Sequence, residues 1–263
     1  MKRPEVRSQK SEASQPMLRC EGLSKSFDGV RALADVSVGL PPSGIVAIIG
    51  PNGAGKTTLI NVLTGFLRPE AGRAFLGERE LTRLAPHRVA RLGIARTFQN
   101  VRLISLVSAL ENVLLVRPNQ KGEQLWRALL RPSVAAEEAR NREEALRWLR
   151  FVGLEEKANE AAGELSYGEQ KLLTLACCLA TGARILLLDE PVAGVHPDMV
   201  LKILGLMREL RAMEKLVVFI EHDIAAVRQV ADLVVVMDDG KVIAQGVPSE
   251  VLERPEIMEA YVG

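Results

Sequence analysis

The sequence has few cysteines, no long apolar run and almost no net charge. It holds three cysteines, Cys20, Cys177 and Cys178, and no C-x-x-C metal spacing. Because adjacent cysteines on one helix do not easily bridge each other, we expect reduced thiols and a cytoplasmic setting. The net charge is only +1 at pH 7. Composition therefore gives no electrostatic case for a nucleic-acid partner or for an anionic membrane surface.

Long apolar stretches are also absent. No run reaches the roughly eighteen apolar residues that a membrane-spanning helix needs, so we expect that the chain does not cross a membrane by itself. Residues 1–16 are polar and lack the apolar segment of a signal peptide. We expect them to form a disordered tail, with a partner-binding arm as the alternative. The sequence shows neither an internal repeat nor a low-complexity segment.

What the chain does have is the composition of a globular protein, with 48% apolar and 25% charged residues. Continuous β-branched apolar runs predict strands buried on both faces of a parallel sheet. These runs are residues 45–49, 185–188 and 216–220. Turn signals at residues 28–29 and 238–240 predict antiparallel pairs on either side of them.

The middle of the chain, about residues 101–181, predicts helices. Its clearest signal is one helical face, formed by Ala145, Trp148, Leu149 and Val152. Pro118 and Pro132 are expected to break this stretch, and the charges at residues 137–144 are expected to form a solvated helix face. The whole chain thus predicts an α/β core with a helical insertion and an antiparallel β layer.

A glycine-rich segment follows the predicted strand 45–49. Residues 50–57 read GPNGAGKT, the G-x-x-x-x-G-K-[ST] pattern of a phosphate-binding loop, and a predicted helix follows at 57–65. Glycines let backbone N–H groups turn toward phosphate oxygens, and the helix adds the positive end of its dipole. We expect Lys56 to bind the β- and γ-phosphates and Thr57 to bind Mg²⁺. An ordinary glycine turn is the alternative. The expected nucleotide contacts of this segment are Gly50, Pro51, Asn52, Gly53, Ala54, Gly55, Lys56, Thr57 and Thr58.

Two carboxylates end the predicted strand at residues 185–188. The segment 185–190 reads ILLLDE, and ligands bind at the carboxyl ends of parallel strands. We expect Asp189 to reach Mg²⁺ through water and Glu190 to take a proton from the attacking water as general base. Acidic residues that merely end a strand and cap the next element are the alternative, which the nearby phosphate loop disfavours.

A second candidate anion site lies at residues 165–169, which read LSYGE before a predicted helix at 170–181. A serine and a glycine at a helix N-terminus can bind an anion. One nucleotide does not need two such sites, so the second is expected to serve the nucleotide of a neighbouring molecule in a dimer. The alternative is an ordinary capping box of Ser166 and Glu169, and spacing alone does not decide between them.

Three single residues carry weaker signals. Gln99 follows a predicted strand, and its amide can contact a metal and attacking water, which suits γ-phosphate sensing. His222 follows the predicted strand 216–220 and could donate to a γ-phosphate. Phe27 precedes the turn at residues 28–29 and could stack on a base. When such residues occur alone, the glutamine is more often a surface amide, the histidine a cap and the phenylalanine a core aromatic.

In this order and spacing the motifs resemble those of the ATP-binding subunits of ABC transporters, over about residues 18–263. The resemblance assigns Phe27 to the A-loop, residues 50–58 to Walker A, Gln99 to the Q-loop, 165–169 to the LSGGQ signature, 185–190 to Walker B, 193–197 to the D-loop and His222 to the switch histidine. It implies catalytic roles for Glu190, His222, Gln99 and Lys56, nucleotide contacts from Phe27, Ser166 and Gly168, and Mg²⁺ binding by Thr57, Gln99 and Asp189.

The resemblance also implies a fold. It is a P-loop NTPase core, with a RecA-like, mostly parallel sheet, joined to an antiparallel β subdomain and an α-helical subdomain at about residues 100–181. The ABC ATP-binding domain would span residues 17–263. Two departures from the family pattern matter. The signature has Tyr167 for the usual glycine and Glu169 for the usual glutamine, and the D-loop has His196 for the more familiar Asp or Asn. Because Ser166 and Gly168 are retained, we expect a working site whose turnover these departures can change.

Within the family, four features resemble the subunits of branched-chain amino acid importers. They are the segment 95–103 (ARTFQNVRL), the LSYG signature, the insertion near residues 116–141, and the end at 257–263 with Tyr261. Urea and amide importers are close relatives. The resemblance implies a head-to-tail dimer that sandwiches two ATP molecules, its second ATPase being the same or a distinct chain. It also implies two permease subunits, an external solute-binding protein, and a place on the cytoplasmic face of the membrane. Residues 98–104 are our candidate permease contact.

Other functions remain as alternatives. A soluble ABC ATPase of DNA repair or translation usually has coiled-coil or zinc insertions or two ABC domains, and this chain has none of these and no basic stripe. We therefore expect no nucleic-acid partner. A regulatory module that binds ATP without hydrolysing it is disfavoured by Glu190 and His222. An exporter-type or lipid-transporting subunit would keep the same chemistry. The sequence does not name the solute, because the ATPase does not touch it.

Overall fold

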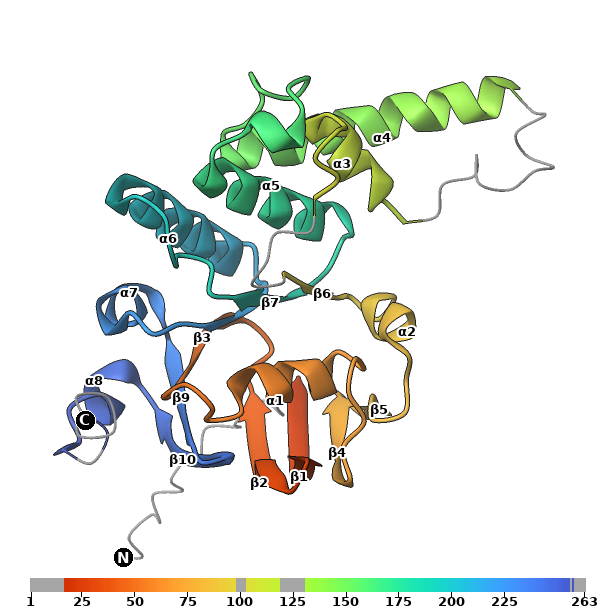
Figure 1. Cartoon of the computed structure of the whole chain (residues 1–263). Coiled ribbons are helices and arrows are strands. Elements are labelled where there is room, and N and C mark those ends of the chain that lie inside the picture. The colour runs from red at the N-terminus through yellow and green to blue at the C-terminus, as the bar shows by residue number, and fades with distance from the viewer. Residues whose placement is uncertain (1–16, 98–102, 119–130, 256, 258–263) are drawn as a thin grey trace, which may run out of the picture.

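The computed structural model describes residues 17–97, 103–118, 131–255 and 257. The predicted tail at 1–16, Gln99, Tyr261, residues 98–102 of the candidate permease contact and part of the predicted insertion lie outside these ranges. Within them, the chain forms two sheets and a layer of helices (Figure 1). The domain boundaries proposed from the sequence stay a prediction.

The larger sheet has six strands in the order β10-β9-β3-β8-β7-β6. Its central strands pair in parallel, and β10 runs antiparallel to β9. The strands are β3 (Gly44–Ile49), β6 (Ile94–Arg96), β7 (Ile185–Asp189), β8 (Leu216–Ile220), β9 (Leu233–Asp238) and β10 (Lys241–Gly246). Every residue of β3, β7 and β8 is buried, because helices or strands cover both faces of this sheet. The three predicted buried strands and the hairpin at 238–240 are therefore confirmed.

The smaller sheet is antiparallel, with the strand order β2-β1-β4-β5. Its strands are β1 (Leu18–Phe27), β2 (Val30–Leu40), β4 (Ala71–Leu76) and β5 (Arg79–Glu80). Helix α1 (Lys56–Leu63) lies between this sheet and the larger one (Figure 1). Leu59 of α1, Leu18 of β1 and Val46 of β3 belong to one buried cluster, so α1 joins the two sheets through a shared core.

Three helices form a layer on the other side of the larger sheet (Figure 1). They are α3 (Ala109–Leu115), α4 (Arg131–Val152) and α5 (Tyr167–Ala180). The predicted face of α4 is confirmed, since Ala145, Leu149 and Val152 are fully buried and Trp148 packs against them. Of the charges at 137–144, Glu138, Arg140, Arg142 and Glu143 are exposed, as expected, whereas Glu137 and Glu144 are half-buried.

Pro132 lies in the first turn of α4, which begins at Arg131. Proline is tolerated there because the first N–H groups of a helix have no partner within the helix. The residues just before this helix are outside the described ranges, so the break expected here stays a prediction.

The remaining helices are α2 (Pro86–Ala90), α6 (Pro197–Ala212), α7 (Ile224–Val230) and α8 (Pro248–Val251). Helix α6 packs on the larger sheet beside α5, with Leu204 and Met207 in the same core as Leu173 of α5. None of the helices in the described ranges is long and apolar enough to cross a membrane. The two sheets and the helical layer confirm the predicted α/β architecture.

Candidate nucleotide site

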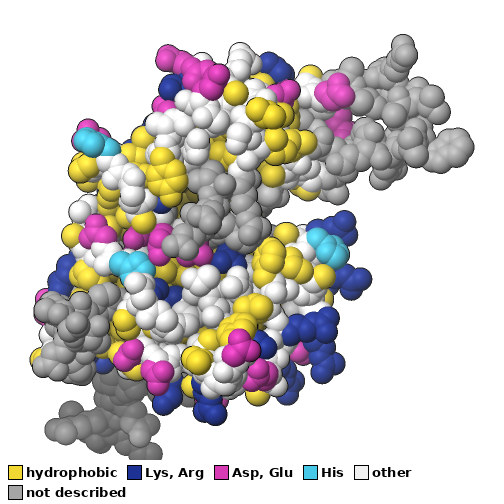
Figure 2. Space-filling model, in the orientation of Figure 1, with side chains coloured by type: hydrophobic (Ala, Val, Ile, Leu, Met, Phe, Trp, Pro, Cys, Tyr) yellow, Lys and Arg dark blue, Asp and Glu magenta, His cyan; other side chains and the backbone are white. Residues whose placement is uncertain are grey.

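Three of the predicted motifs meet at one edge of the larger sheet. Strands β3, β8 and β7 are neighbours and run in parallel, so their carboxyl ends lie side by side. The loop 50–55 follows β3, Glu221 and His222 follow β8, and Glu190 follows Asp189 at the end of β7. Such an edge is where open α/β sheets bind ligands. Figure 2 shows acidic side chains in the band between the helical layer and the two sheets.

The loop 50–55 has a backbone that requires glycine. Gly53 and Gly55 have φ angles of 85° and 93°, in the left-handed region that L side chains rarely adopt. A Cβ atom on Gly55 would also lie 2.3 Å from the carbonyl oxygen of Ala32 in β2. Among the described residues, no side chain caps α1. The first N–H groups of the helix can therefore face a phosphate.

Lys56 is buried at the start of α1. Its Nζ donates to the carbonyl oxygens of Gly50 at 2.7 Å and Pro51 at 2.8 Å. Burial lowers the pKa of Lys56, while the nearby carboxylates of Glu190 and Asp189 act to raise it. The ammonium group is therefore held by the loop, close to the two carboxylates at the carboxyl end of β7. Thr57 is exposed and Thr58 half-buried on the same turn.

Asp189 is buried in an ion pair that the sequence did not reveal. Its Oδ2 lies 3.1 Å from Nη2 of Arg96 at the end of β6, and the two side chains are 4% and 6% exposed. Arg96 also donates to the side chain of Asn61 in α1. The Asp189 N–H donates to the hydroxyl of Thr97 at 3.0 Å. The contacts of Arg96 and Asp189 therefore connect β6, β7 and α1. In the sequence, Gln99 follows Arg96 by three residues.

Glu190 and His222 face each other across the end of β7 and β8. His222 Nε2 lies 3.3 Å from Glu190 Oε1, and both side chains are partly exposed. Glu190 has a φ angle of 49°, which is unusual for a residue with a side chain. Its N–H donates to the carbonyl oxygen of Ile220 at 3.1 Å. The structure thus brings together two residues that are far apart in the sequence, and their polar atoms can reach water.

Two further polar residues hold the segment after β7, and the sequence reasoning missed both. Glu221 is 2% exposed and accepts the N–H groups of Val192 at 2.9 Å and His222 at 3.2 Å. Burial raises the pKa of Glu221, although these two N–H groups and the charge of Lys171 act to lower it. Lys171 of α5 donates to two carbonyl oxygens of the same segment. The only sequence signal was their position, next to His222 and just after the signature.

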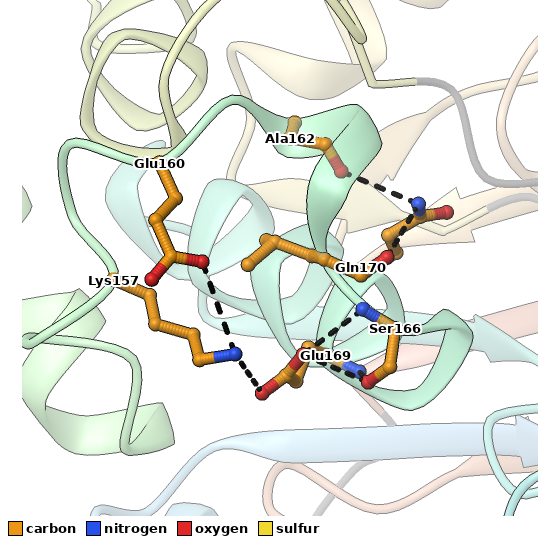
Figure 3. Close-up of polar contacts among 7 residues, drawn as sticks. Lys157, Glu160, Ala162, Ser166, Glu169 and Gln170 are labelled. Carbon is orange, nitrogen blue, oxygen red and sulfur yellow. Dashed lines mark hydrogen bonds and ion pairs between the residues drawn. The ribbon is translucent and has the colours of Figure 1, made fainter.

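Ser166 begins α5, in the helical layer, and forms the capping box that was the alternative interpretation. Its hydroxyl accepts the Glu169 N–H at 3.4 Å, while the Glu169 carboxylate accepts the Ser166 N–H at 2.9 Å (Figure 3). Glu169 also pairs with Lys157 at 2.9 Å, which lowers the pKa of that carboxyl, and the Ser166 hydroxyl contributes. The Gln170 amide donates to the carbonyl oxygens of Ala162 and Leu165. None of the described hydrogen bonds joins Ser166 to the loop 50–55.

The other predicted site residues have separate surroundings. Phe27, at the end of β1, is 42% exposed, so its interpretation as a core residue is wrong. Lys25 lies 5.3 Å from the centre of its ring. Gly168 lies in α5 against the Met199 side chain of α6. His196 is exposed and caps α6, accepting the Asp198 N–H at 3.4 Å.

Known proteins share this sequence and architecture. The protein-family model described as ABC transporter matches residues 33–193. The high-affinity branched-chain amino acid transport ATP-binding protein LivG of Salmonella typhimurium is 40% identical over 252 residues, which cover 95% of this chain and 99% of LivG.

Two solved structures are also similar. One is the ADP conformation of MJ1267, an ATP-binding cassette of an ABC transporter, with a TM-score of 0.81 and 33% identity over 95% of this chain and 100% of that one. The other is the dimeric structure of the bacterial ABC transporter cassette MJ0796, with a TM-score of 0.74 and 27% identity over 88% of this chain and 99% of that one. The family match, the extent of the similarity to LivG and the shared architecture show that this chain belongs to the ABC transporter family, as one of its ATP-binding and ATP-hydrolysing cassettes.

Proposed function

We propose that this chain is the ATPase subunit of an importer for branched-chain amino acids. It hydrolyses ATP at the loop 50–58 and powers uptake through two permease subunits, on the cytoplasmic face of the membrane. The observation that carries the catalytic part is the edge of the larger sheet where Lys56, Asp189, Glu190 and His222 meet. The choice of solute rests on the similarity to LivG along almost the entire length of both chains.

ATP binding begins with the loop 50–58. Backbone N–H groups of the loop and the start of α1 bind the phosphate oxygens, and Lys56 adds a positive charge to the β- and γ-phosphates. Its partners are two loop carbonyls, which keep the ammonium beside the loop that is proposed to bind those phosphates. Phe27 is exposed at the end of β1 and offers its ring to the base.

Mg²⁺ fits the oxygen atoms at this edge. Hard divalent cations take carboxylate and hydroxyl oxygens, and Asp189 and Thr57 supply one of each, with the amide of Gln99 as the third predicted ligand. When bound, the ion neutralises charge on the phosphate oxygens. The ion pair with Arg96 fixes the direction of the buried Asp189 carboxylate, which supports its proposed role as a ligand.

Hydrolysis needs a base for the attacking water and a donor for the γ-phosphate. Glu190 is partly exposed and can accept the proton of a water molecule. His222 lies beside it and donates to a γ-phosphate oxygen, while Lys56 stabilises the charge on that phosphoryl group. Gln99, at the end of the segment after β6, completes this set as the group that contacts the metal and the attacking water.

A second subunit completes the site. Ser166 and Gly168 lie on the helical layer, and none of the described contacts joins them to the loop 50–55 of the same chain. In a head-to-tail dimer they bind the γ-phosphate of the nucleotide on the partner, and ATP then closes the dimer because it contacts both halves. The dimeric structure of the similar cassette MJ0796 supports the association of two such cassettes. The second ATPase is a copy of this chain or a distinct one.

The permease contact is the surface that follows β6. Exposed apolar side chains gather over α3 and the segment before it (Figure 2), among them Ile104, Leu115 and Val116. They line a pocket with Leu103 and Thr97, next to the Q-loop. A permease segment with an apolar face fits this surface, and the solute-binding protein acts only through the permeases.

The experiment that tests this function is solute uptake. Proteoliposomes would contain the chain, its two permeases and enclosed Mg-ATP, with the solute-binding protein outside. We expect ATP-dependent uptake of labelled leucine that Glu190→Gln abolishes. Leu103→Asp should uncouple uptake from ATP hydrolysis if the permease contact is correct. Uptake of urea in place of leucine would contradict the proposed solute, and unchanged leucine uptake with Glu190→Gln would contradict the proposed mechanism.

A further inference from the structure

A lysine from the helical layer holds the backbone of the catalytic glutamate. Lys171 Nζ donates to the carbonyl oxygens of Glu190 and Ala193, each at 2.6 Å. Lys171 lies on α5, one turn after the signature serine, whereas both carbonyls belong to the segment that follows β7. This contact therefore joins the element that carries the signature directly to the loop that carries the proposed general base.

The backbone that Lys171 holds is strained. Glu190 has a left-handed φ of 49°, a conformation that costs a residue with a side chain about 1–3 kcal/mol unless its surroundings stabilise it. The Ala193 N–H donates to the Glu190 carbonyl at 3.3 Å, closing a tight turn whose two carbonyls both point at the ammonium. Without that donor, both carbonyls would lose their hydrogen bond to the ammonium, and the Glu190 carbonyl would keep the Ala193 N–H.

The same segment is held from its other side by a buried carboxylate. Glu221 accepts the Val192 N–H and the His222 N–H, so it fixes the switch histidine and the loop together. The opposite charges of Lys171 and Glu221 thus enclose residues 190–193. The edge of the Tyr167 ring lies beside Gly194, and Lys171 Nζ lies 5.2 Å from the centre of that ring. The tyrosine that replaces the usual signature glycine therefore covers the outer side of the lysine.

We propose that Lys171 is a positioning residue for ATP hydrolysis, which aligns Glu190 with the attacking water and makes that alignment depend on the position of α5. The inference rests on the proposed role of Glu190. Lys171 itself does not touch the nucleotide, so its loss changes the rate of the chemical step and leaves ATP binding by the loop 50–58 in place. A catalytic group displaced by about 1 Å can lose on the order of a hundred-fold in rate.

The test compares the kinetics of ATP hydrolysis by the full chain and three variants. Lys171→Met keeps the length of the side chain and removes its donors; we expect kcat to fall about ten- to a hundred-fold while KM for ATP changes less than about two-fold. Lys171→Arg keeps N–H donors and should recover most of kcat. Lys215→Met is the matched control, because Lys215 is also half-buried and donates to one carbonyl, that of Ala183, at 2.5 Å. It should leave kcat unchanged.

Thermal unfolding of each variant separates positioning from stability. If Lys171→Met does not fold, Lys171→Leu gives the same comparison with a shorter side chain that also lacks donors. The inference is overturned if wild-type kcat persists without the lysine, or if Lys215→Met lowers kcat as much as Lys171→Met does. Absence of ATP hydrolysis by the wild-type chain would instead contradict the proposed function itself.

Discussion

At the scale of single residues, a buried ion pair supports the partly exposed Glu190 and His222 of the candidate site. Arg96 and Asp189 are almost completely buried. Removing one member leaves the other charge buried without its ion-pair partner. We expect Arg96→Met to lower the free energy of unfolding by about 3–5 kcal/mol. Urea unfolding would measure this loss.

A matched control for that prediction is Arg150→Met. Arg150 pairs with Glu155 at 2.5 Å, but both side chains are exposed to solvent. Exposed pairs contribute about 0–1 kcal/mol, so this variant should unfold at nearly the wild-type urea concentration. Equal losses in the two variants would contradict the argument from burial.

The altered signature has its own residue-scale consequence. Glu169 places a carboxylate beside Ser166, where the γ-phosphate of the partner is proposed to bind, and Lys157 offsets that charge at 2.9 Å. In a Glu190→Gln background, we expect Lys157→Met to weaken ATP-driven dimerisation by about three- to five-fold, close to 1 kcal/mol. Adding Glu169→Gln should restore it, because the uncompensated carboxylate is gone. Light scattering over a series of protein concentrations measures both.

The Glu169→Gln variant tests whether charge compensation explains the weaker dimerisation of Lys157→Met. If Glu169→Gln does not reverse the loss, Lys157 acts on the dimer in another way, and the charge-compensation argument fails. The double-mutant cycle isolates the pair because each single variant removes the same ion pair.

At the scale of elements, the larger sheet separates two cores. Residues of β3 alternate between them, with Ile45, Ala47 and Ile49 facing the helical layer and Val46 and Ile48 facing α1 and the smaller sheet. This alternation follows from the period of two along a strand. Damage to the helical layer should therefore affect the nucleotide loop only indirectly.

That separation predicts the effect of a cavity in α4. Leu149 is fully buried in the core of the helical layer, so Leu149→Ala should cost about 2–5 kcal/mol of stability. The Kd for ATP at the loop 50–58 should change by less than about two-fold, which corresponds to under about 0.5 kcal/mol. The control is Leu201→Ala on α6, a leucine that is 60% exposed. Its cost should stay within about 0.5 kcal/mol. An equal cost for the two would contradict the core assignment.

Local pattern also explains how far the sequence predicted these elements. The runs in β3, β7 and β8 are short, β-branched and apolar, so burial on both faces follows directly, and the loop 50–57 carries a pattern that specifies its own conformation. Arg96, Lys171 and Glu221 were missed because their partners come from other elements. Arg96, for example, meets a residue 93 positions away, and no local period reports such a contact.

At the scale of the whole molecule, the two parts of the proposed nucleotide site lie in different layers of the chain. The phosphate loop lies between the sheets, and Ser166 begins a helix of the helical layer (Figure 1). Lys171 connects this helix to Glu190 within the same chain. In the proposed dimer, the signature of one subunit contacts the nucleotide bound by its partner. Lys171 would transmit a movement of the signature helix to Glu190 of the same subunit, which would link the two sites of the dimer.

The most direct test of this account is the mass of Glu190→Gln with and without Mg-ATP, measured by size-exclusion chromatography with light scattering. We predict a monomer without nucleotide and a dimer with ATP, formed by the chain alone or with the second ATPase subunit of its transporter. Adding Ser166→Arg should abolish that dimer while ATP still binds to the loop. A dimer that persists with Ser166→Arg, or an ATP-bound chain that stays monomeric alone and with the second ATPase, would contradict the composite site.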